Sequence, residues 1–278
     1  MKYESICFKS KFIKEGSAIA NYHFSVKPVS RGQGRSVVEA AAYRSGEKLR
    51  CDYYGQSADY TRKSGICHTE IILPPNAPHD YKDRQTLWNA VEYSERRIDS
   101  RLAREVEISL PNELTVDEQI ILVRNFVTTY FVKQGMCADI AIHEGRKKDA
   151  SRNNPHAHIL LTTRHIDEDG FHLKNRDWDK VSNVGFWRKQ WADIQNKEYE
   201  RRGLDIKVSH ESYEKQGIDQ EATKYLGPTA TALERYGICT KRGNENRSII
   251  ARNKEREIVQ KAHQLQKKDR RHARYKER

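Results

Sequence analysis

The stretch that decides the fold is ADIAIHEGRKKDASRNNPHAHILLTTR, residues 138–164. Residues 138–143 and 158–164 read as strands, and a basic loop, EGRKKDASRNNP, joins them directly. Two strands joined by a loop can pair antiparallel, whereas parallel neighbours need a crossover of a dozen or more residues, usually containing a helix. We therefore expect these two strands to pair antiparallel in one sheet.

The rest of the chain supplies further strands and helices. Three more strands are expected, at residues 21–29, 67–73 and 103–110. Four helices are expected, at residues 36–49, 80–101, 115–134 and 183–202. Ser36 and Thr115 fit N-caps, and residues 51–65 read as a loop or irregular hairpin. This order predicts an α+β fold with one antiparallel sheet of about five strands and helices packed mainly on one face.

Composition limits the class of protein. The 278-residue chain is 36% hydrophobic and 32% charged, which suffices for one core. No apolar run approaches the roughly 18 residues that cross a bilayer, and the N-terminus lacks the apolar segment of a secretory signal, so no membrane insertion is expected. The five cysteines are widely spaced and form no CxxC pair. This spacing fits a reducing cytoplasm, and we expect a cytoplasmic protein.

The net charge of +12 is concentrated at one end of the chain. Residues 241–278 contain 14 Lys and Arg against 5 Asp and Glu, a net of +9. Such a tail indicates a polyanionic partner, with nucleic acid as the first candidate, or else a solvated charged helix. Four regions are expected: a disordered extension at 1–19, a catalytic core at 20–205, a C-terminal annex at 206–246 and a basic helical tail at 247–278.

Three histidines are candidate metal ligands. His156 and His158 are two residues apart on one strand and therefore point to the same face, and His143 ends the strand expected to lie alongside. Three imidazoles with open coordination positions suit one catalytic divalent metal. The alternative is a set of surface histidines beside a basic loop.

The connecting loop contains four cations near the end of the histidine strands. These candidate DNA-binding residues, which could contact a phosphate backbone, are Arg146, Lys147, Lys148 and Arg152. The alternative is that they form a solvated hairpin tip.

A tyrosine and two glutamates are candidates for the remaining chemistry. Tyr43 follows three alanines on the expected helix 36–49, where small neighbours would let a DNA strand approach. A phenol with its usual pKa of about 10 is a weak nucleophile and needs a nearby cation or base. The competing tyrosines, which spacing alone does not rule out, are Tyr53, Tyr54 and Tyr60.

In REVEISLP (104–111), Glu105 and Glu107 share one strand face. Either carboxylate could orient a ligand histidine or transfer a proton, or both could simply face solvent. His23, on the polar face of the first strand, is a further candidate to support the metal ligands.

These segments together resemble the relaxase domain of the MobA/MobL family of plasmid mobilization proteins, within the HUH endonucleases. The matching motifs, in family order, are NYHFSVKPVSRGQGRSVVEAAAYRSG, LAREVEISLP, AIHEG with NPHAHILLTTR, HESYEKQGI, and LGPTATALERYGICTKRGNENR. The resemblance implies an RRM/ferredoxin-like HUH core. One departure is Tyr225, which stands where many relatives have a histidine before Leu-Gly-Pro.

The resemblance also implies roles for individual residues. Tyr43 matches the catalytic tyrosine and Glu107, less surely Glu105, the acidic residue; the three histidines match the ligands of one divalent ion, Mn²⁺ or Mg²⁺ in function. The implied reaction is a nick in single-stranded DNA at an origin of transfer, through a 5′-phosphotyrosyl intermediate that is later resealed. Accessory relaxosome proteins and a coupling protein are the implied partners. Two alternatives are a rolling-circle replication or transposition initiator of the HUH type, and a DNA-binding protein without catalysis.

Overall fold

The computed structural model describes residues 22–34, 36–145 and 154–276, and these form two compact units. The first unit ends at His210 and contains the sheet, and the second runs from Glu211 to the end of the described chain. The extension expected at residues 1–19 lies outside the described residues.

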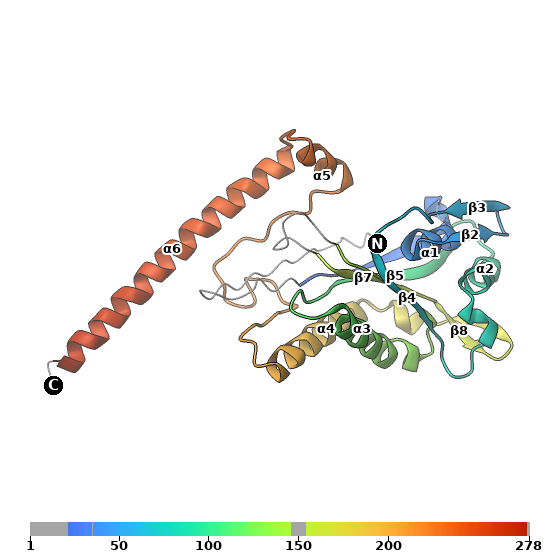
Figure 1. Cartoon of the computed structure of the whole chain (residues 1–278), viewed down its shortest axis with the longest axis horizontal. Helices are drawn as coiled ribbons and strands as arrows, with labels where there is room; N and C mark the ends of the chain where they lie inside the picture. Colours follow the sequence, from blue (N-terminus) through green and yellow to red (C-terminus); the bar gives the residue numbers. More distant parts are fainter. Residues whose placement is uncertain (1–21, 35, 146–153, 277–278) are drawn as a thin grey trace. The chain divides into compact units, whose positions relative to one another are not determined.

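The first unit is organised around a five-stranded antiparallel sheet (Figure 1). Its strands, in spatial order, are β1 (Phe24–Ser30), β5 (Arg101–Ser109), β7 (His156–Leu161), β6 (Ala138–His143) and β4 (Ile66–Ile72). All four neighbouring pairs are antiparallel, including β6 with β7, which the loop-connected stretch 138–164 predicted. The predicted α+β fold and its five-stranded sheet are confirmed.

Helices cover both faces of the sheet, which corrects the expectation that they lie mainly on one. On one face pack α1 (Val37–Ser45) and α2 (Arg84–Ser94), and on the other pack α3 (Val116–Tyr130) and α4 (Val181–Arg201) (Figure 1). Each face has its own apolar cluster, because strand residues alternate between faces and both sets include buried apolar side chains. Leu160 contributes to the α1/α2 cluster and its neighbours Ile159 and Leu161 to the α3/α4 cluster.

Local sequence signals account for most helix ends. The Ser36 side chain accepts hydrogen bonds from Val38 and Glu39, and Thr115 forms a capping box with Glu118. Helix α1 ends at Ser45, four residues earlier than expected, because Gly46 takes a left-handed conformation (φ 71°). A Cβ at Gly46 would also lie 2.5 Å from the Cδ1 atom of Ile66.

Helix α2 is shorter than the segment 80–101 in which it was expected. A short 3-10 helix, η2 (His79–Lys82), precedes it, and Asp83 caps its N-terminus by accepting from the Thr86 amide. Glu95 has extended backbone angles and ends the helix. The backbone carbonyl of Glu95 accepts a hydrogen bond from Arg31, so a tertiary contact holds the chain where the helix stops.

Two small hairpins and further 3-10 turns complete the first unit. The hairpin of β2 (Lys48–Cys51) and β3 (Gln56–Asp59) occupies part of the expected loop or hairpin at 51–65. A second hairpin, β8 (Arg164–Asp167) with β9 (Gly170–Lys174), follows the sheet. The other short helices of the described chain are η1 (Arg31–Gln33), η3 (Val132–Gln134) and η5 (Arg176–Asp179).

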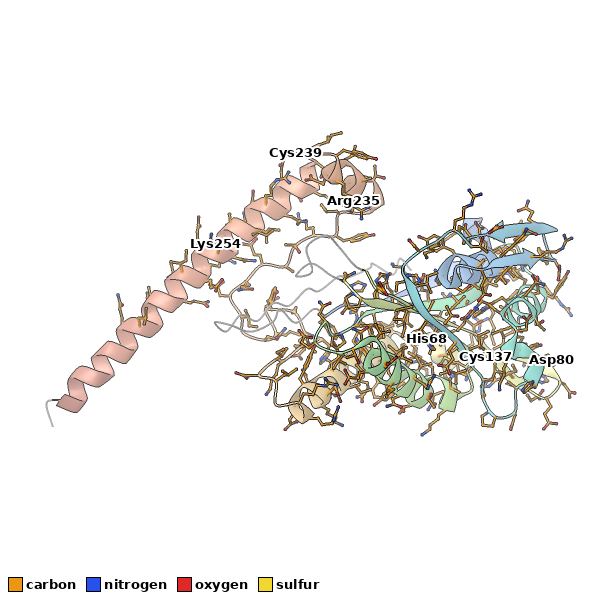
Figure 2. The ribbon with its side chains drawn as sticks, in the orientation of Figure 1. His68, Asp80, Cys137, Arg235, Cys239 and Lys254 are labelled. Atoms are coloured by element: carbon orange, nitrogen blue, oxygen red, sulfur yellow. The ribbon has the colours of Figure 1, made fainter. Side chains whose placement is uncertain are left out.

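The second unit contains α5 (Pro228–Arg235) and the long helix α6 (Lys241–Lys276). Glu221 holds the first half of α6 through Arg252 and Arg256, with N–O distances of 2.5 and 2.9 Å. Cys239, in this unit, is exposed, whereas Cys137, in the first unit, is buried (Figure 2). None of the helices in the described ranges combines the length and apolarity needed to cross a bilayer.

Candidate metal centre and tyrosine helix

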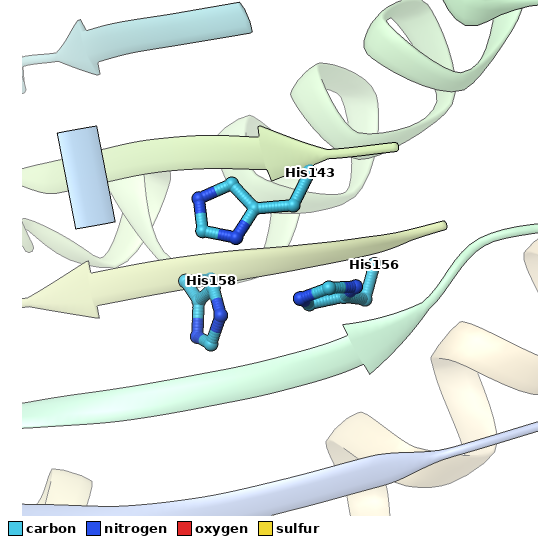
Figure 3. Close-up of side chains that lie close together, drawn as sticks. All are labelled: His143, His156 and His158. Carbon is cyan, nitrogen blue, oxygen red and sulfur yellow. The ribbon is translucent and has the colours of Figure 1, made fainter. Parts of the chain in front are cut away.

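Three histidine side chains converge on the sheet face that carries α1. His143 ends β6 and pairs in register with His156 on β7, and His158 is two residues further along the same strand. One ring nitrogen from each histidine lies within 4.8 Å of the others (Figure 3). The ring centroids are 4.9–5.2 Å apart. Strand alternation therefore brings together the three residues that the sequence proposed as ligands.

The second nitrogen of each ring is hydrogen-bonded to an oxygen. His143 Nε2 donates to the Arg44 carbonyl at 2.8 Å, His156 Nδ1 to the Asn154 carbonyl at 2.8 Å, and His158 Nδ1 to Glu105 Oε1 at 2.9 Å. These oxygens only accept, so each bonded nitrogen carries the proton of the neutral imidazole. The lone pairs then belong to Nδ1 of His143 and to Nε2 of His156 and His158, the arrangement that metal-binding histidines adopt.

Burial keeps two of the histidines uncharged. It lowers the pKa of His143 to about 4, against the opposing effect of the hydrogen bond to Arg44, and the nearby His158, Lys63 and His156 lower it further. Burial likewise lowers the pKa of His156. A neutral imidazole is the form that binds metal, so both side chains are in the ligand form near neutral pH.

The donor set fits one divalent cation. Nitrogens that bind one tetrahedral ion at roughly 2.1 Å lie about 3.4 Å apart, so nitrogens within 4.8 Å of one another reach such an ion by a closure of up to about 1.4 Å. Three imidazoles leave coordination positions for oxygen atoms of a substrate. The residues present can therefore hold a metal, and the ligand type suits several first-row ions.

Glu105 is the carboxylate that contacts the histidine cluster. Its Oε1 accepts from His158, and both of its oxygens are bound by Arg44, at 2.8 Å to Nε and 2.6 Å to Nη2. Burial by itself would raise the pKa of Glu105, but the hydrogen bonds from His158 and Arg44 and the charge of Arg44 hold that pKa well below its usual range. Glu105 therefore stays ionised and orients His158.

Arg44 is a residue of the site that sequence reasoning missed. Its side chain binds Glu105 and its carbonyl accepts from His143, so it joins α1 to two strands of the sheet. The sequence offered one signal for Arg44, which is its position directly after Tyr43. Its pairing with Glu105, 61 residues away, is visible only in the tertiary structure.

Glu107 lies on the same face as Glu105 but has a different partner. It stands opposite His158 in the β5/β7 register, and its Oε2 accepts from Lys27 at 3.1 Å. Burial raises its pKa, but the charges of Lys27, His158 and His23 and the Lys27 hydrogen bond outweigh this and lower the pKa. Among the glutamates of β5, Glu105 rather than Glu107 is bonded to a cluster histidine in this structure.

His23 lies just before β1, at the end of the sheet where the histidine cluster sits. Its backbone exchanges hydrogen bonds with Ser109, at 2.7 Å to the hydroxyl and 3.0 Å from the Ser109 amide. Ser109 is the register partner of His156. His23 is not one of the three histidines whose ring nitrogens converge.

Tyr43 is half exposed on α1, with 49% of its surface accessible. The Lys63 ammonium lies 3.7 Å from the centre of its ring and donates to its backbone carbonyl at 2.6 Å. The Tyr60 ring meets it edge-on at 5.2 Å. Lys63 therefore contacts both the ring and the backbone carbonyl of Tyr43.

The competing tyrosines have other environments. The Tyr60 hydroxyl donates to Glu39 at 3.2 Å, and burial together with this carboxylate raises its pKa, which disfavours the phenolate. Tyr53 and Tyr54 contact each other in the β2–β3 turn, where Tyr53 lies against Arg31. Of the four candidates, Tyr43 is the one adjacent to a residue that contacts the histidine cluster.

Buried ion pairs hold α1 in place from its first residue. Glu92 Oε1 accepts from the Val37 amide at 2.7 Å, and Glu92 Oε2 pairs with Arg31 at 2.9 Å. At the other end of α1, Arg44 binds Glu105. The helix that presents Tyr43 is thus anchored at both ends by carboxylates on other elements.

The two ends of the basic loop are hydrogen-bonded to each other. The Asn154 amide donates to the Gly145 carbonyl at 3.1 Å, and the Asn154 carbonyl accepts from His156. Gly145 has a φ of 57°, and a Cβ there would lie 1.9 Å from the Asn154 carbonyl oxygen. The loop cations Arg146, Lys147, Lys148 and Arg152 lie outside the described residues.

Tyr225, which stands where many relatives have a histidine, lies in the second unit. Its side chain is exposed, and its backbone carbonyl accepts a hydrogen bond from Arg242.

Known proteins match most of this chain in sequence. A sequence profile described as the MobA/MobL family matches residues 35–236. The mobilization protein MobL of Acidithiobacillus ferridurans is 37% identical over 246 residues, which is 78% of this chain and 64% of that protein. The conjugal transfer protein TraA of Agrobacterium fabrum is 37% identical over 249 residues, 77% of this chain and 22% of that protein.

A solved structure is also similar. It is described as the molecular basis of vancomycin resistance transfer in Staphylococcus aureus. Its TM-score is 0.64 and its sequence identity is 36%, and the match covers 70% of this chain and 100% of the solved chain. The matched region of this chain thus spans about a fifth of the TraA relative and just under two thirds of the MobL relative.

Proposed function

The chain belongs to the MobA/MobL family, and we propose that it works as a conjugative relaxase, which nicks one DNA strand at a plasmid origin of transfer by tyrosine-mediated, metal-dependent transesterification. The observation that carries the proposal is the bonding around Arg44. This residue joins the helix of the candidate nucleophile Tyr43 to a cluster of three histidine nitrogens. The names of the relatives, a mobilization protein and a conjugal transfer protein, support the same activity.

In the proposed reaction the phenolic oxygen of Tyr43 forms a bond to phosphorus, and the bond between phosphorus and the 3′ oxygen breaks. The phenol loses its proton and the departing 3′ oxygen gains one, which leaves a 5′-phosphotyrosyl link and a free 3′-OH. The reverse reaction reseals the strand. A divalent ion held by His143, His156 and His158, Mn²⁺ or Mg²⁺, would polarise the scissile phosphate.

The other side chains position and charge the site. Glu105 holds the His158 ring in the ligand tautomer, and Arg44 holds Glu105. The Lys63 ammonium lies over the Tyr43 ring and donates to its backbone carbonyl, so it positions this tyrosine. We assign proton transfer to Glu107, which is ionised beside Lys27. His23 helps to keep Glu107 ionised, because its charge lowers the pKa of this carboxylate.

The proposed partners follow from this activity. The DNA partner is a single strand at the origin of transfer, with Arg146, Lys147, Lys148 and Arg152 as phosphate contacts at the mouth of the site. Accessory relaxosome proteins and a coupling protein would complete the assembly. The cysteines of the chain form no CxxC pair, which suits a reducing compartment, and we place the protein in the cytoplasm.

Two other functions use the same features differently. A rolling-circle replication or transposition initiator would share the histidine and tyrosine chemistry, but the mobilization and transfer relatives favour the relaxase. A DNA-binding protein without catalysis would need no tyrosine beside a lysine and no set of lone pairs facing one point.

The test mixes the full chain with single-stranded origin DNA and Mn²⁺ or Mg²⁺ and measures the covalent adduct by denaturing gel. Tyr43→Phe should form no adduct, whereas Tyr60→Phe, a matched loss of one hydroxyl, should retain most of it. His156→Ala should lose metal-dependent adduct formation. An adduct that persists in Tyr43→Phe would remove Tyr43 as the nucleophile, and full activity of His156→Ala after EDTA treatment would remove the metal.

A further inference from the structure

A basic groove lies where β5 begins. It has a volume of about 1100 Å³ and is lined by the turn between α2 and β5, by the β8–β9 hairpin and by η5. Six cationic side chains line it against three carboxylates, Glu95, Asp99 and Asp179. The cations are Arg96, Arg97, Arg101, Arg164, Lys174 and Arg176. The groove therefore has a net positive charge.

The carboxylates of the groove are already engaged by its cations. Buried Glu95 accepts from Arg164 at 2.7 Å and from Lys174 at 3.1 Å, and Asp179 pairs with Arg101 at 2.9 Å. In the described parts of the chain, Arg96 and Arg176 have no ion-pair partner, and both are exposed. The groove thus contains fixed cations on its walls and two arginines available to an anion.

Aromatic rings continue from the rim of the groove. Tyr93 lines the groove and is 58% exposed. Its ring lies 6.0 Å from that of Tyr53, which in turn lies 4.9 Å from Tyr54, and both of these rings are also exposed. The Arg31 guanidinium lies 4.2 Å from the centre of the Tyr53 ring and holds it in place.

The groove is separate from the histidine cluster. Arg101, at the start of β5, lines the groove, while Glu107, six residues further along this strand, stands opposite His158. At roughly 3.4 Å per strand residue, the two ends are about 20 Å apart. One nucleotide at the cluster cannot also occupy the groove, so a ligand that uses both must be a chain.

We propose that this groove is a second binding site for single-stranded DNA, with phosphates on its cations and bases on the tyrosine rings; the inference rests on the proposed relaxase function. Alternating charge and stacking surfaces match a strand in which phosphates and bases alternate. An acidic peptide would use the cations but would leave the row of exposed rings without a role. The strand that continues from the nick site beyond the histidine cluster is the DNA that would fill the groove.

The test measures binding of oligo-dT by fluorescence anisotropy, with the full chain in EDTA so that no strand is cut. Two lengths are compared: a short strand that can fill one site and a strand several times longer. The wild type should bind the longer strand more tightly and with a steeper salt dependence. Arg96→Ala/Arg176→Ala should lower the slope of log affinity against log salt for the longer strand by about 1.4, since each phosphate contact contributes about 0.7.

Tyr93 provides the second measurement. Tyr93→Ala should weaken binding of the longer strand about fivefold or more, whereas Tyr93→Phe, which keeps the ring, should bind like the wild type. The matched control for the charge change is Lys133→Ala/Lys197→Ala, which removes two exposed cations outside the groove. Thermal melts establish that each variant is folded.

Wild-type affinity and salt slope in both Arg96→Ala/Arg176→Ala and Tyr93→Ala would overturn the inference. An equal change in the control pair would overturn it as well, because the effect would then reflect net charge alone. The adduct assay with Tyr43→Phe tests the proposed function independently, so a chain that nicks DNA but shows no groove effect disproves only the second site.

Discussion

Arg44 and Glu105 form a two-point ion pair between α1 and β5, with distances of 2.8 Å from Nε to Oε1 and 2.6 Å from Nη2 to Oε2. Both residues also contact the histidine cluster, Arg44 through its carbonyl to His143 and Glu105 through Oε1 to His158. Because Tyr43 directly precedes Arg44, the pair sets the position of the tyrosine helix relative to the proposed ligands. A paired planar geometry of this kind is specific to arginine.

Glu105→Gln is expected to weaken metal binding about 10- to 100-fold, because it removes the charged acceptor that orients His158. Glu107→Gln should weaken it less, since Glu107 is bonded to Lys27 instead of a histidine. Isothermal titration of both variants with Mn²⁺ measures the difference. A greater or equal loss in Glu107→Gln would mean that the wrong glutamate has been assigned to orient His158.

Lys63→Met is expected to slow adduct formation in single-turnover assays, because it removes the cation beside the Tyr43 ring and the hydrogen bond to the Tyr43 carbonyl. Lys63→Arg should recover part of the rate. Lys48→Met, at an exposed lysine paired with Asp59, is the control for loss of one charge. If Lys63→Met and Lys48→Met react at the same rate, Lys63 has no part in positioning Tyr43.

Asp139→Ala is expected to lower the free energy of unfolding by about 3 kcal/mol, because it removes the buried carboxylate that binds Arg84 and leaves this arginine with Glu47, a more exposed partner. Asp139 receives two bonds from Arg84, each 2.9 Å, and one from the Trp88 indole at 2.8 Å. Asp193→Ala, in an exposed pair with Lys189, should cost no more than about 1 kcal/mol. Urea denaturation measures both, and similar losses would show that the Arg84 contact is not stabilising.

Stability without metal should fall as the pH is lowered from about 6.5, the usual pKa of histidine, toward 4. The pKa of His143 is lowered to about 4 in the folded protein, so in this window the unfolded chain binds more protons and unfolding is favoured. One such proton contributes at most about 1.4 kcal/mol per pH unit, and His156, whose pKa is also lowered, acts in the same direction.

His143→Gln is the matched variant for this pH effect, because its amide can still donate to the Arg44 carbonyl but cannot ionise. Urea denaturation in EDTA across the window should give a shallower pH dependence than for the wild type. An unchanged dependence would assign the effect to other groups. The carboxylates with lowered pKa values, which include Glu105 and Glu107, lower the stability below about pH 5, so the two proteins are compared between about pH 6.5 and 5.

Ending the chain at Gln266 is expected to weaken DNA binding and flatten its salt dependence, because it removes seven Lys and Arg and only two acidic residues. The contacts that hold α6 to Glu221 end at Arg256 and remain in the shortened chain. Anisotropy with single-stranded DNA over a salt series measures the slope. A slope equal to that of the full chain would assign the end of α6 a role other than phosphate binding.

Periodicity along the chain was sufficient for the local features. Alternation on β5 placed Glu105 and Glu107 on one face, and the two-residue spacing of His156 and His158 did the same on β7. The direct link between the last two strands of the sheet predicted their antiparallel pairing. Each of these depends only on backbone geometry within a few residues, which the order of polar and apolar residues reveals.

The sequence by itself therefore determined the sheet, the shared face of the histidines and the helix that carries Tyr43. Only the tertiary structure decided that helices cover both faces, that Glu105 and not Glu107 holds His158, and that Arg44 and Lys63 belong to the site. It also decided that the turn between α2 and β5, the β8–β9 hairpin and η5 together line the basic groove. These features join residues tens of positions apart, and such contacts follow from how elements pack and not from any local pattern of residues.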